Sequence, residues 1–140
     1  MIIADTGAFV AVINSRDEYH SRAQSAFAIK SEPLITTYPV ISETCHLLKR
    51  SAGLEGEQLF LQTIVAGVAE VFQLQNSHLL RMTKFMKKYA DLPMDLADAS
   101  LVVLAEEIKD GRILTTDRRD FSVYRWNSTQ PFQNLLFSDC

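Results

Sequence analysis

Short apolar runs alternate with segments of helical periodicity along this chain, and this alternation constrains its fold more than any other feature. The apolar runs predict strands at residues 1–4, 34–38, 71–74 and 112–116, with an edge strand in the tail at 123–126. Helices are expected at 6–13, 19–29, 39–53, 55–65 and 77–89, and from 93 to a stop at Asp110-Gly111, with Ser77 capping the helix at 77–89. Strands that alternate with helices predict a three-layer α/β/α domain with a mainly parallel central sheet.

The composition fits one globular domain over residues 1–140. Hydrophobic residues make up 47% of the chain and charged residues 22%, so a core can form without disulfides or a structural metal. The net charge of −3 gives no global positive field of the kind that attracts nucleic acids, although bound metal ions reverse the local sign around carboxylates. Cys45 and Cys140 form no CxxC pair, and Cys140 is expected to be an exposed thiol. Without a leader or a membrane-length apolar run, a cytoplasmic protein with no membrane association is expected.

Two acidic side chains fall on helix faces that should be buried. In PMDLADASLVVLAEE, Asp98 lies four residues after Met94 and shares its apolar stripe. In PVISETCHLLK, Glu43 lies three residues after Val40 and shares its stripe in the same way. A buried, unpaired carboxylate is costly or holds its proton, so each of these acids needs a cap, a basic partner or a metal ion.

Each acid that attracts attention also has a local explanation. Asp95 can be an N-cap with Asp98 as the third helical residue, and Glu43 can lie in a first turn, where the helix dipole favours an acid. Asp5 and Asp117 follow predicted strands, where aspartate is a preferred cap of the next helix. Ligands of an open parallel sheet bind beyond the carboxyl ends of its strands, however, so all of these acids can converge there.

Carboxylates that cluster at one end of a sheet repel one another unless a cation neutralises them. Oxygen ligands without a cluster of Cys or His favour the hard ions Mg²⁺ and Mn²⁺ over zinc. Such ions activate water and stabilise charge on a leaving oxygen in phosphoryl chemistry. The sequence therefore indicates a metal-dependent phosphodiesterase.

The motifs DTGAFVAVIN, ISETCHLL, DLADASLVVLAEE and ILTTDRRDF follow one another along nearly the whole chain. Together they resemble the PIN-domain ribonucleases, and most closely the VapC toxins of bacterial toxin–antitoxin pairs. The resemblance implies RNA hydrolysis with Mg²⁺ or Mn²⁺, a small cognate antitoxin protein as partner, and a homodimer. The catalytic and metal-binding acids that it implies are Asp5, Glu43, Asp98 and Asp117.

Residues around the last motif are expected to assist. Thr115 matches a small hydroxyl position of the family and is expected to order the site. Asp120 is an auxiliary acid or the cap of the next turn, and Arg118 and Arg119 are candidate substrate contacts because they follow Asp117. The aromatic residues of the tail are expected to pack around the last strand or, where exposed, to form a partner surface; they are Phe121, Tyr124, Trp126 and Phe132.

Other classes of protein fit the sequence less well. A receiver domain needs two adjacent acids after the first strand and a lysine after a late one, and this chain has DTG and TTDRR there. A haloacid-dehalogenase-like phosphatase needs Asp-x-Asp after the first strand, where residue 7 is glycine. The remaining alternative is a PIN-like RNA-binding or RNA-processing protein that is not a toxin or has lost activity. RNA binding without cleavage would favour it.

Overall fold

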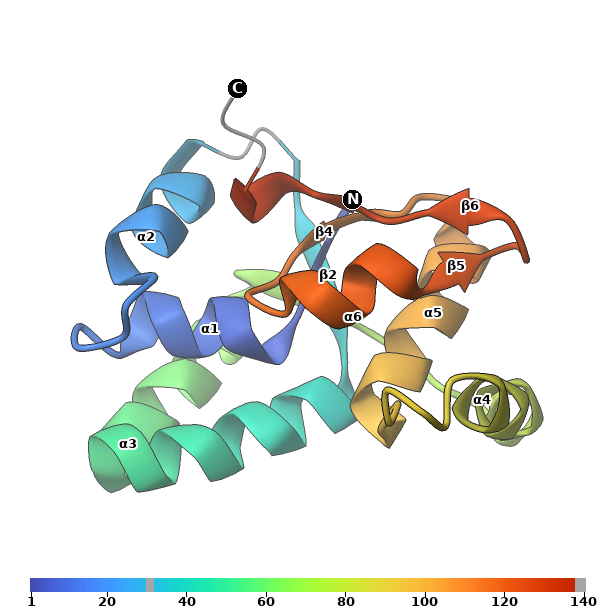
Figure 1. Ribbon diagram of the computed structural model, residues 1–140. Helices are drawn as coiled ribbons and strands as arrows, with labels where there is room; N and C mark the ends of the chain where they lie inside the picture. The colour runs from blue at the N-terminus through green and yellow to red at the C-terminus, as the bar shows by residue number, and fades with distance from the viewer. Residues whose placement is uncertain (30–31, 138–140) are drawn as a thin grey trace.

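A parallel sheet forms the centre of the protein, whose computed structural model describes residues 1–29 and 32–137 (Figure 1). Its strands run in the order β3-β2-β1-β4-β7, and each neighbouring pair is parallel. The strands are β1 (Ile2–Ala4), β2 (Leu34–Thr37), β3 (Ala69–Phe72), β4 (Arg112–Leu114) and β7 (Gln133–Asn134). The expected α/β class with a mainly parallel sheet is confirmed.

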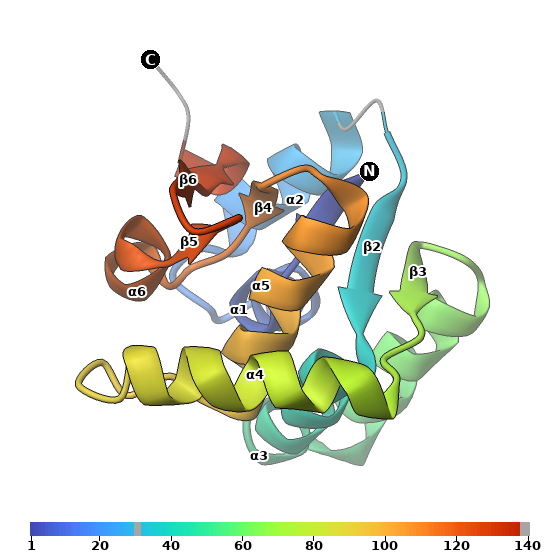
Figure 2. The ribbon, with the colours of Figure 1, turned by 90° about the vertical axis from the view of Figure 1, so that its right-hand side faces the viewer.

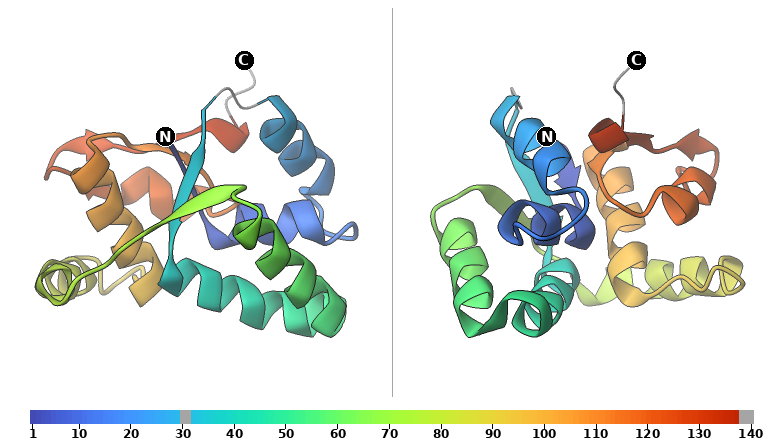
Figure 3. Two further views of the ribbon diagram at one scale, coloured as in Figure 1. Left: turned by 180° about the vertical axis from the view of Figure 1, so that it is seen from behind. Right: turned by 60° about the vertical axis from the view of Figure 1, so that its left-hand side comes forward.

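Helices flank the sheet, with α5 on one side and α1 on the other (Figure 2). They are α1 (Thr6–Ile13), α2 (His20–Ile29), α3 (Tyr38–Val65), α4 (Asn76–Lys88), α5 (Leu96–Ile108) and α6 (Arg118–Val123), followed by the 3₁₀ turn η1 (Leu135–Phe137). The helix α3 is broken at Gly53, whose φ of 70° and ψ of −174° suit glycine alone at low cost. The predicted stop at this glycine is therefore confirmed, and the two parts of α3 meet at an angle (Figure 3).

The core explains why these segments take their places. The central strand β1 is fully enclosed, and Ile3 and Ala4 are 0% exposed. The run Leu101–Ala105 of α5 is apolar on every side and equally buried, because the helix lies between the sheet and α4. A buried hydroxyl joins the two central strands, since Thr36 Oγ1 donates to the carbonyl of Ala4 at 2.8 Å.

The helix expected from residue 93 begins at Leu96, after its cap Asp95, and two further helix boundaries also differ from the prediction. The cap of α4 is Gln75 rather than Ser77: its backbone carbonyl accepts from His78 N at 2.9 Å, and the His78 ring accepts from Gln75 N at 3.0 Å. This reciprocal pair satisfies amides that a serine cap two residues later would leave outside the helix. At the other boundary, α5 ends at Lys109 in a left-handed conformation with φ 56°, just before the expected stop.

The edge strand predicted at 123–126 is confirmed only at Arg125–Trp126, and it does not join the main sheet. Val123 ends α6, and β5 (Arg125–Trp126) pairs antiparallel with β6 (Gln130–Pro131) in a separate ribbon. The edge of the main sheet is β7, whose Gln133 N donates to the Gly111 carbonyl at 2.9 Å. Trp126 packs directly on Gly111, where an added Cβ would lie 2.1 Å from its Nε1. This contact directs the tail across the end of β4.

Two further expectations concern the cysteine thiols and the absence of a membrane-spanning helix. Cys140, the expected exposed thiol, lies outside the described residues, whereas Cys45 is half-buried. Within the residues described, no helix is long and apolar enough to cross a membrane.

Candidate active site

The acids singled out from the sequence meet at the carboxyl end of the sheet. Asp5 follows β1 directly and Asp117 follows β4, and these two strands are neighbours. The chain leaves β1 toward β2 on one side and reaches β4 on the other, so this end is where the strand order reverses. Asp98 joins them, because one of its carboxylate oxygens lies within 4.8 Å of one of Asp117, and the charges of Asp5 and Asp117 both raise its pKa. The fold thus places side chains distant in sequence within one electrostatic cluster.

Asp5 is the most enclosed member, with 6% of its surface exposed. Its Oδ1 accepts from Thr6 N at 2.7 Å, so the expected capping role is present. Its Oδ2 accepts from the Thr115 hydroxyl at 2.7 Å. The same hydroxyl oxygen accepts from Asp117 N at 3.0 Å, so Thr115 connects the two acids at the ends of β1 and β4.

Asp98 stands in the first turn of α5. Asp95 caps that helix as predicted, because its Oδ1 accepts from Asp98 N at 2.8 Å. The Asp98 carboxylate accepts through Oδ2 from the Tyr124 hydroxyl at 2.8 Å. Tyr124 is 0% exposed, and its ring is held between those of Tyr89 and Phe121, each with a centroid distance of 5.0 Å.

Tyr124 is the site residue that sequence reasoning missed. The prediction that Tyr124 packs in the tail is confirmed, but its hydroxyl also donates a hydrogen bond to one oxygen of Asp98. Burial raises the pKa of Tyr124, which keeps the hydroxyl protonated as a donor. The two residues are 26 positions apart, and no local spacing in the sequence links them.

Asp117 and Asp120 repeat the arrangement of Asp95 and Asp98. Asp117 caps α6 and accepts from Asp120 N at 3.0 Å, so Asp120 is the third helical residue rather than the cap of the next turn. Carboxylate oxygens of Asp98, Asp117 and Asp120 lie within 4.8 Å of one another. This spacing allows one cation to contact all of them.

Glu43 approaches the cluster from α3. That helix begins at Tyr38 after the cap Thr37, which puts Glu43 in the second turn. The alternative of a first-turn acid stabilised by the helix dipole is therefore wrong. Glu43 is half-buried, and the charges of Asp95 and Asp5 reinforce the effect of burial on its pKa.

The protonation behaviour of the cluster reflects burial and mutual repulsion. Burial first, and neighbouring charges second, raise the pKa of Asp5 to about 6, of Glu43 to about 7 and of Asp98 to about 8. Burial also raises the pKa of Asp117. Within residues 1–29 and 32–137, the acids Asp5, Glu43, Asp98 and Asp117 have no ion pair with a basic side chain. An all-oxygen donor set with uncompensated charge fits a hard divalent ion such as Mg²⁺ or Mn²⁺.

The two candidate arginines have different surroundings. Arg119 donates to Asp120 Oδ1 at 3.0 Å and to the Leu92 carbonyl at 2.9 Å, and its side chain is 75% exposed beside the acids. Arg118 instead lies over the Phe137 ring, with its guanidinium carbon 4.3 Å from the ring centroid. Arg119 is thus the better placed of the two to reach a substrate at the cluster.

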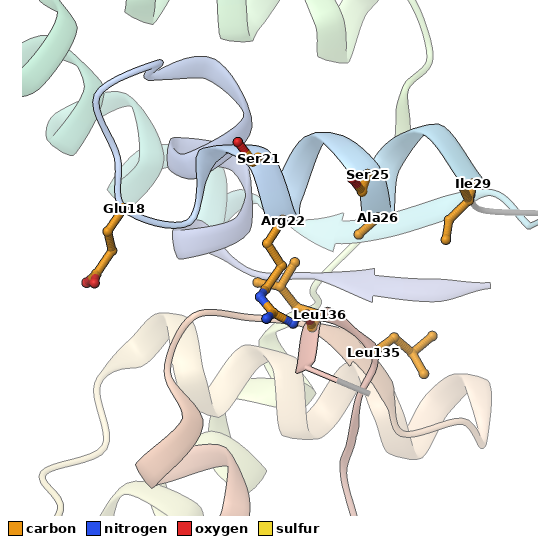
Figure 4. A pocket seen from close by; sticks show the side chains of 8 residues that line it. All are labelled: Glu18, Ser21, Arg22, Ser25, Ala26, Ile29, Leu135 and Leu136. Atoms are coloured by element: carbon orange, nitrogen blue, oxygen red, sulfur yellow. Dashed lines mark hydrogen bonds between the residues drawn. The ribbon is translucent and has the colours of Figure 1, made fainter. Parts of the chain in front are cut away.

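A separate pocket of about 600 Å³ lies between α2 and η1, away from these acids (Figure 4). Arg22 extends across it and donates to the Leu136 carbonyl at 3.1 Å. Glu18 is its acidic residue, at the rim, so the pocket lacks the grouped carboxylates of the sheet end. The pocket lies at the contact between α2 and the tail of the chain.

Comparisons with known proteins agree with this geometry. The family model described as the PIN domain matches residues 2–127. Ribonuclease VapC26 of Mycobacterium tuberculosis is 27% identical over 124 residues, which cover 89% of this chain and 92% of that protein. The crystal structure of VapC20 of Mycobacterium tuberculosis, described as a sarcin–ricin loop cleaving toxin, superposes with a TM-score of 0.79. That match covers 84% of this chain and 90% of the other at 19% identity, and it shows a shared fold.

The raised pKa values predict how the metal-free protein responds to pH. The ordinary values are 3.8 for aspartate and 4.5 for glutamate, and the folded values reach about 8 at Asp98. The folded state therefore binds protons more readily than the unfolded state, and stability falls as pH rises from about 5 to about 8. In EDTA, the melting temperature should be higher at about pH 5.5 than at about pH 8.5, whereas added Mn²⁺ should stabilise more at the higher pH. A Mn²⁺ effect equal at both pH values would contradict this account.

Replacing Tyr124 by Phe tests the hydrogen bond to Asp98. The ring packing remains, but Asp98 loses the donor that orients it, so the Kd for Mn²⁺ measured by calorimetry should rise about 10- to 100-fold. Tyr89→Phe is the matched control, because the Tyr89 hydroxyl accepts from Arg125 N and does not bond to Asp98. Equal Kd values in the two variants would show that Tyr124 serves packing alone.

Proposed function

The chain belongs to the PIN domain family, whose model spans residues 2–127, and on this premise we propose that it is a metal-dependent endoribonuclease. The reaction is hydrolysis of RNA phosphodiester bonds with Mg²⁺ or Mn²⁺. The observation that carries the proposal is the group of acids at the carboxyl end of the sheet. Four of them have no ion pair with a basic side chain in the part of the chain described: Asp5, Glu43, Asp98 and Asp117. The similarity to Ribonuclease VapC26 supports RNA as the substrate.

Asp5, Glu43, Asp98 and Asp117 are the residues that we propose as metal ligands, together with Asp120, whose carboxylate oxygen lies within 4.8 Å of those of Asp98 and Asp117. When bound, a divalent ion supplies Lewis acidity and activates water for attack on phosphorus. Thr115 keeps Asp5 oriented, and Tyr124 occupies Oδ2 of Asp98, so that Oδ1 of Asp98 remains available to a ligand.

Two further residues contribute charge around this centre. Asp120 assists as an auxiliary acid, and its charge is partly balanced by Arg119. The exposed guanidinium of Arg119 is our candidate for contact with an RNA phosphate, since arginine matches the geometry of phosphate oxygens. Arg118 is the weaker candidate because its guanidinium is engaged with Phe137.

The biological role that we propose is that of a cytoplasmic toxin, held inactive by a small antitoxin protein and acting as a homodimer. The similarity to VapC26 and to the toxin VapC20 supports this role. Because VapC20 cleaves the sarcin–ricin loop, an RNA with that loop is a first substrate to try. The complete set of acids argues against a PIN-like protein that binds RNA without cutting it.

RNA cleavage by the purified protein tests the activity. Cleavage should require Mg²⁺ or Mn²⁺ and stop in EDTA. Asp98→Asn should lower kcat/KM by at least about 100-fold, the upper range for loss of one supporting contact at a metal site. Glu55→Gln is a suitable control, because Glu55 is exposed on the far part of α3, beyond Gly53. Full activity of Asp98→Asn in EDTA would refute the mechanism.

The toxin role needs a test in cells. Induced expression of the wild type should arrest bacterial growth, whereas Asp5→Asn, which removes a ligand charge, should allow growth at the same protein level. Continued growth of cells that express the wild type would contradict the toxin role. The ribonuclease activity would then rest on the assay with purified protein.

A further inference from the structure

We propose that an open cleft beside the acids is a subsite for one unpaired nucleobase of the RNA, next to the phosphodiester that is cut. The inference rests on the proposed ribonuclease function. The cleft has a volume of about 710 Å³ and lies between the N-terminal turns of α3, as far as His46, and the start of α5, which are adjacent in the fold (Figure 1). Its lining residues include Tyr38, Ser42, Glu43, His46, Asp95 and Leu96.

The cleft is continuous with the candidate metal site. Glu43 lines the cleft and also belongs to the acid cluster, where the charge of Asp5 acts on it. Asp95 lines the opposite wall, and its charge acts on both Glu43 and Asp98. A nucleotide beside a phosphate held at the acids therefore has direct access to the cleft.

The lining favours a base over a phosphate. Tyr38 is 58% exposed and Leu96 is 48% exposed, so two large apolar side chains face an open space. Aromatic rings stack on any nucleobase, and carboxylate oxygens accept from base N–H groups. The Asp95 carboxylate repels a phosphate, which disfavours the RNA backbone in the cleft.

The backbone that carries Tyr38 is held in place. Tyr38 is the first residue of α3 and precedes Pro39, whose ring fixes the backbone of that turn. It follows the buried Thr37, whose hydroxyl lies 2.7 Å from that of Ser100 on α5. Because the backbone is already ordered, stacking of a base on Tyr38 costs only the freedom of its side chain.

Beyond the cleft, the charge along α3 changes sign. His46, Lys49 and Arg50 continue the exposed face that begins at Ser42, at the spacing of successive helical turns. The described residues provide no ion pair for Lys49 or Arg50. Lys49 lies about 9 Å along the helix axis from Glu43, so these cations can bind the RNA backbone on its way out of the site.

Substitution of Tyr38 tests the subsite. Tyr38→Ala should raise KM for single-stranded RNA about 5- to 100-fold with little change in kcat, as expected for a lost stacking contact outside the reacting centre. Tyr38→Phe retains the ring and should behave as the wild type. An unchanged KM in Tyr38→Ala would overturn the proposal.

An abasic RNA identifies the occupant. With the base removed from a nucleotide flanking the cut, the wild-type enzyme should lose the same factor as Tyr38→Ala does with intact RNA. Tyr38→Ala should lose nothing more on the abasic substrate, because both changes remove one interaction. If the effects of Tyr38→Ala and of base removal multiply, whichever of the two nucleotides flanking the cut is abasic, the Tyr38 ring and the base do not interact.

A binding measurement separates this proposal from the proposed function. Asp117→Asn, expected to be inactive, allows the Kd of fluorescein-labelled RNA in Mg²⁺ to be measured by anisotropy. Binding that depends on Tyr38 without any cleavage by the wild type would support the subsite and refute the ribonuclease. Cleavage by the wild type with the same KM in Tyr38→Ala would support the ribonuclease and refute the subsite. A change in molar mass by light scattering in Tyr38→Ala would assign the face to contact between two copies of the chain, which would also overturn the subsite.

Discussion

Repulsion among carboxylates at the carboxyl ends of β1 and β4 explains most of the contacts around them. Asp5 is buried, and its charge raises the pKa of both Glu43 and Asp98. The fold tolerates this arrangement because helix starts meet there: Asp5 caps α1, and Asp117 caps α6. Amides at helix starts stabilise negative charge, but only in part, since burial still outweighs them in the pKa values. The metal ion that we propose would supply the remainder.

Two copies of one local motif serve different purposes at this site. Asp95 and Asp98 begin α5 as Asp117 and Asp120 begin α6, with a capping acid followed three residues later by a second acid. The second acids have different partners: Asp98 receives the neutral hydroxyl of Tyr124, and Asp120 receives the guanidinium of Arg119. Asp98 therefore has no basic partner among the described residues, whereas the charge of Asp120 is partly balanced by Arg119.

The parts of the protein that could be predicted from the sequence are those marked by a run of apolar residues or by an acid within such a run. The strands β1 and β4 and the helix α5 were recognisable because their apolar runs are buried on all sides, and Asp98 and Glu43 stood out against apolar stripes. The tail was not predictable, because β5, β6 and β7 have two residues each and show no alternation. Their pairing depends on Trp126 packing on Gly111, a tertiary contact. The hydrogen bond from Tyr124 to Asp98 could not be predicted for the same reason, since it forms only when the tail lies against α5.

Anomalous diffraction from crystals grown with Mn²⁺ tests the proposed metal centre most directly. A manganese peak is expected at the carboxyl end of the sheet, with oxygens of Asp5, Asp98 and Asp117 in or near its coordination sphere. Asp5→Asn should weaken or abolish that peak. The absence of a peak at this end in well-ordered wild-type crystals, or a peak confined to other acids such as Glu106 and Glu107, would contradict the proposed centre.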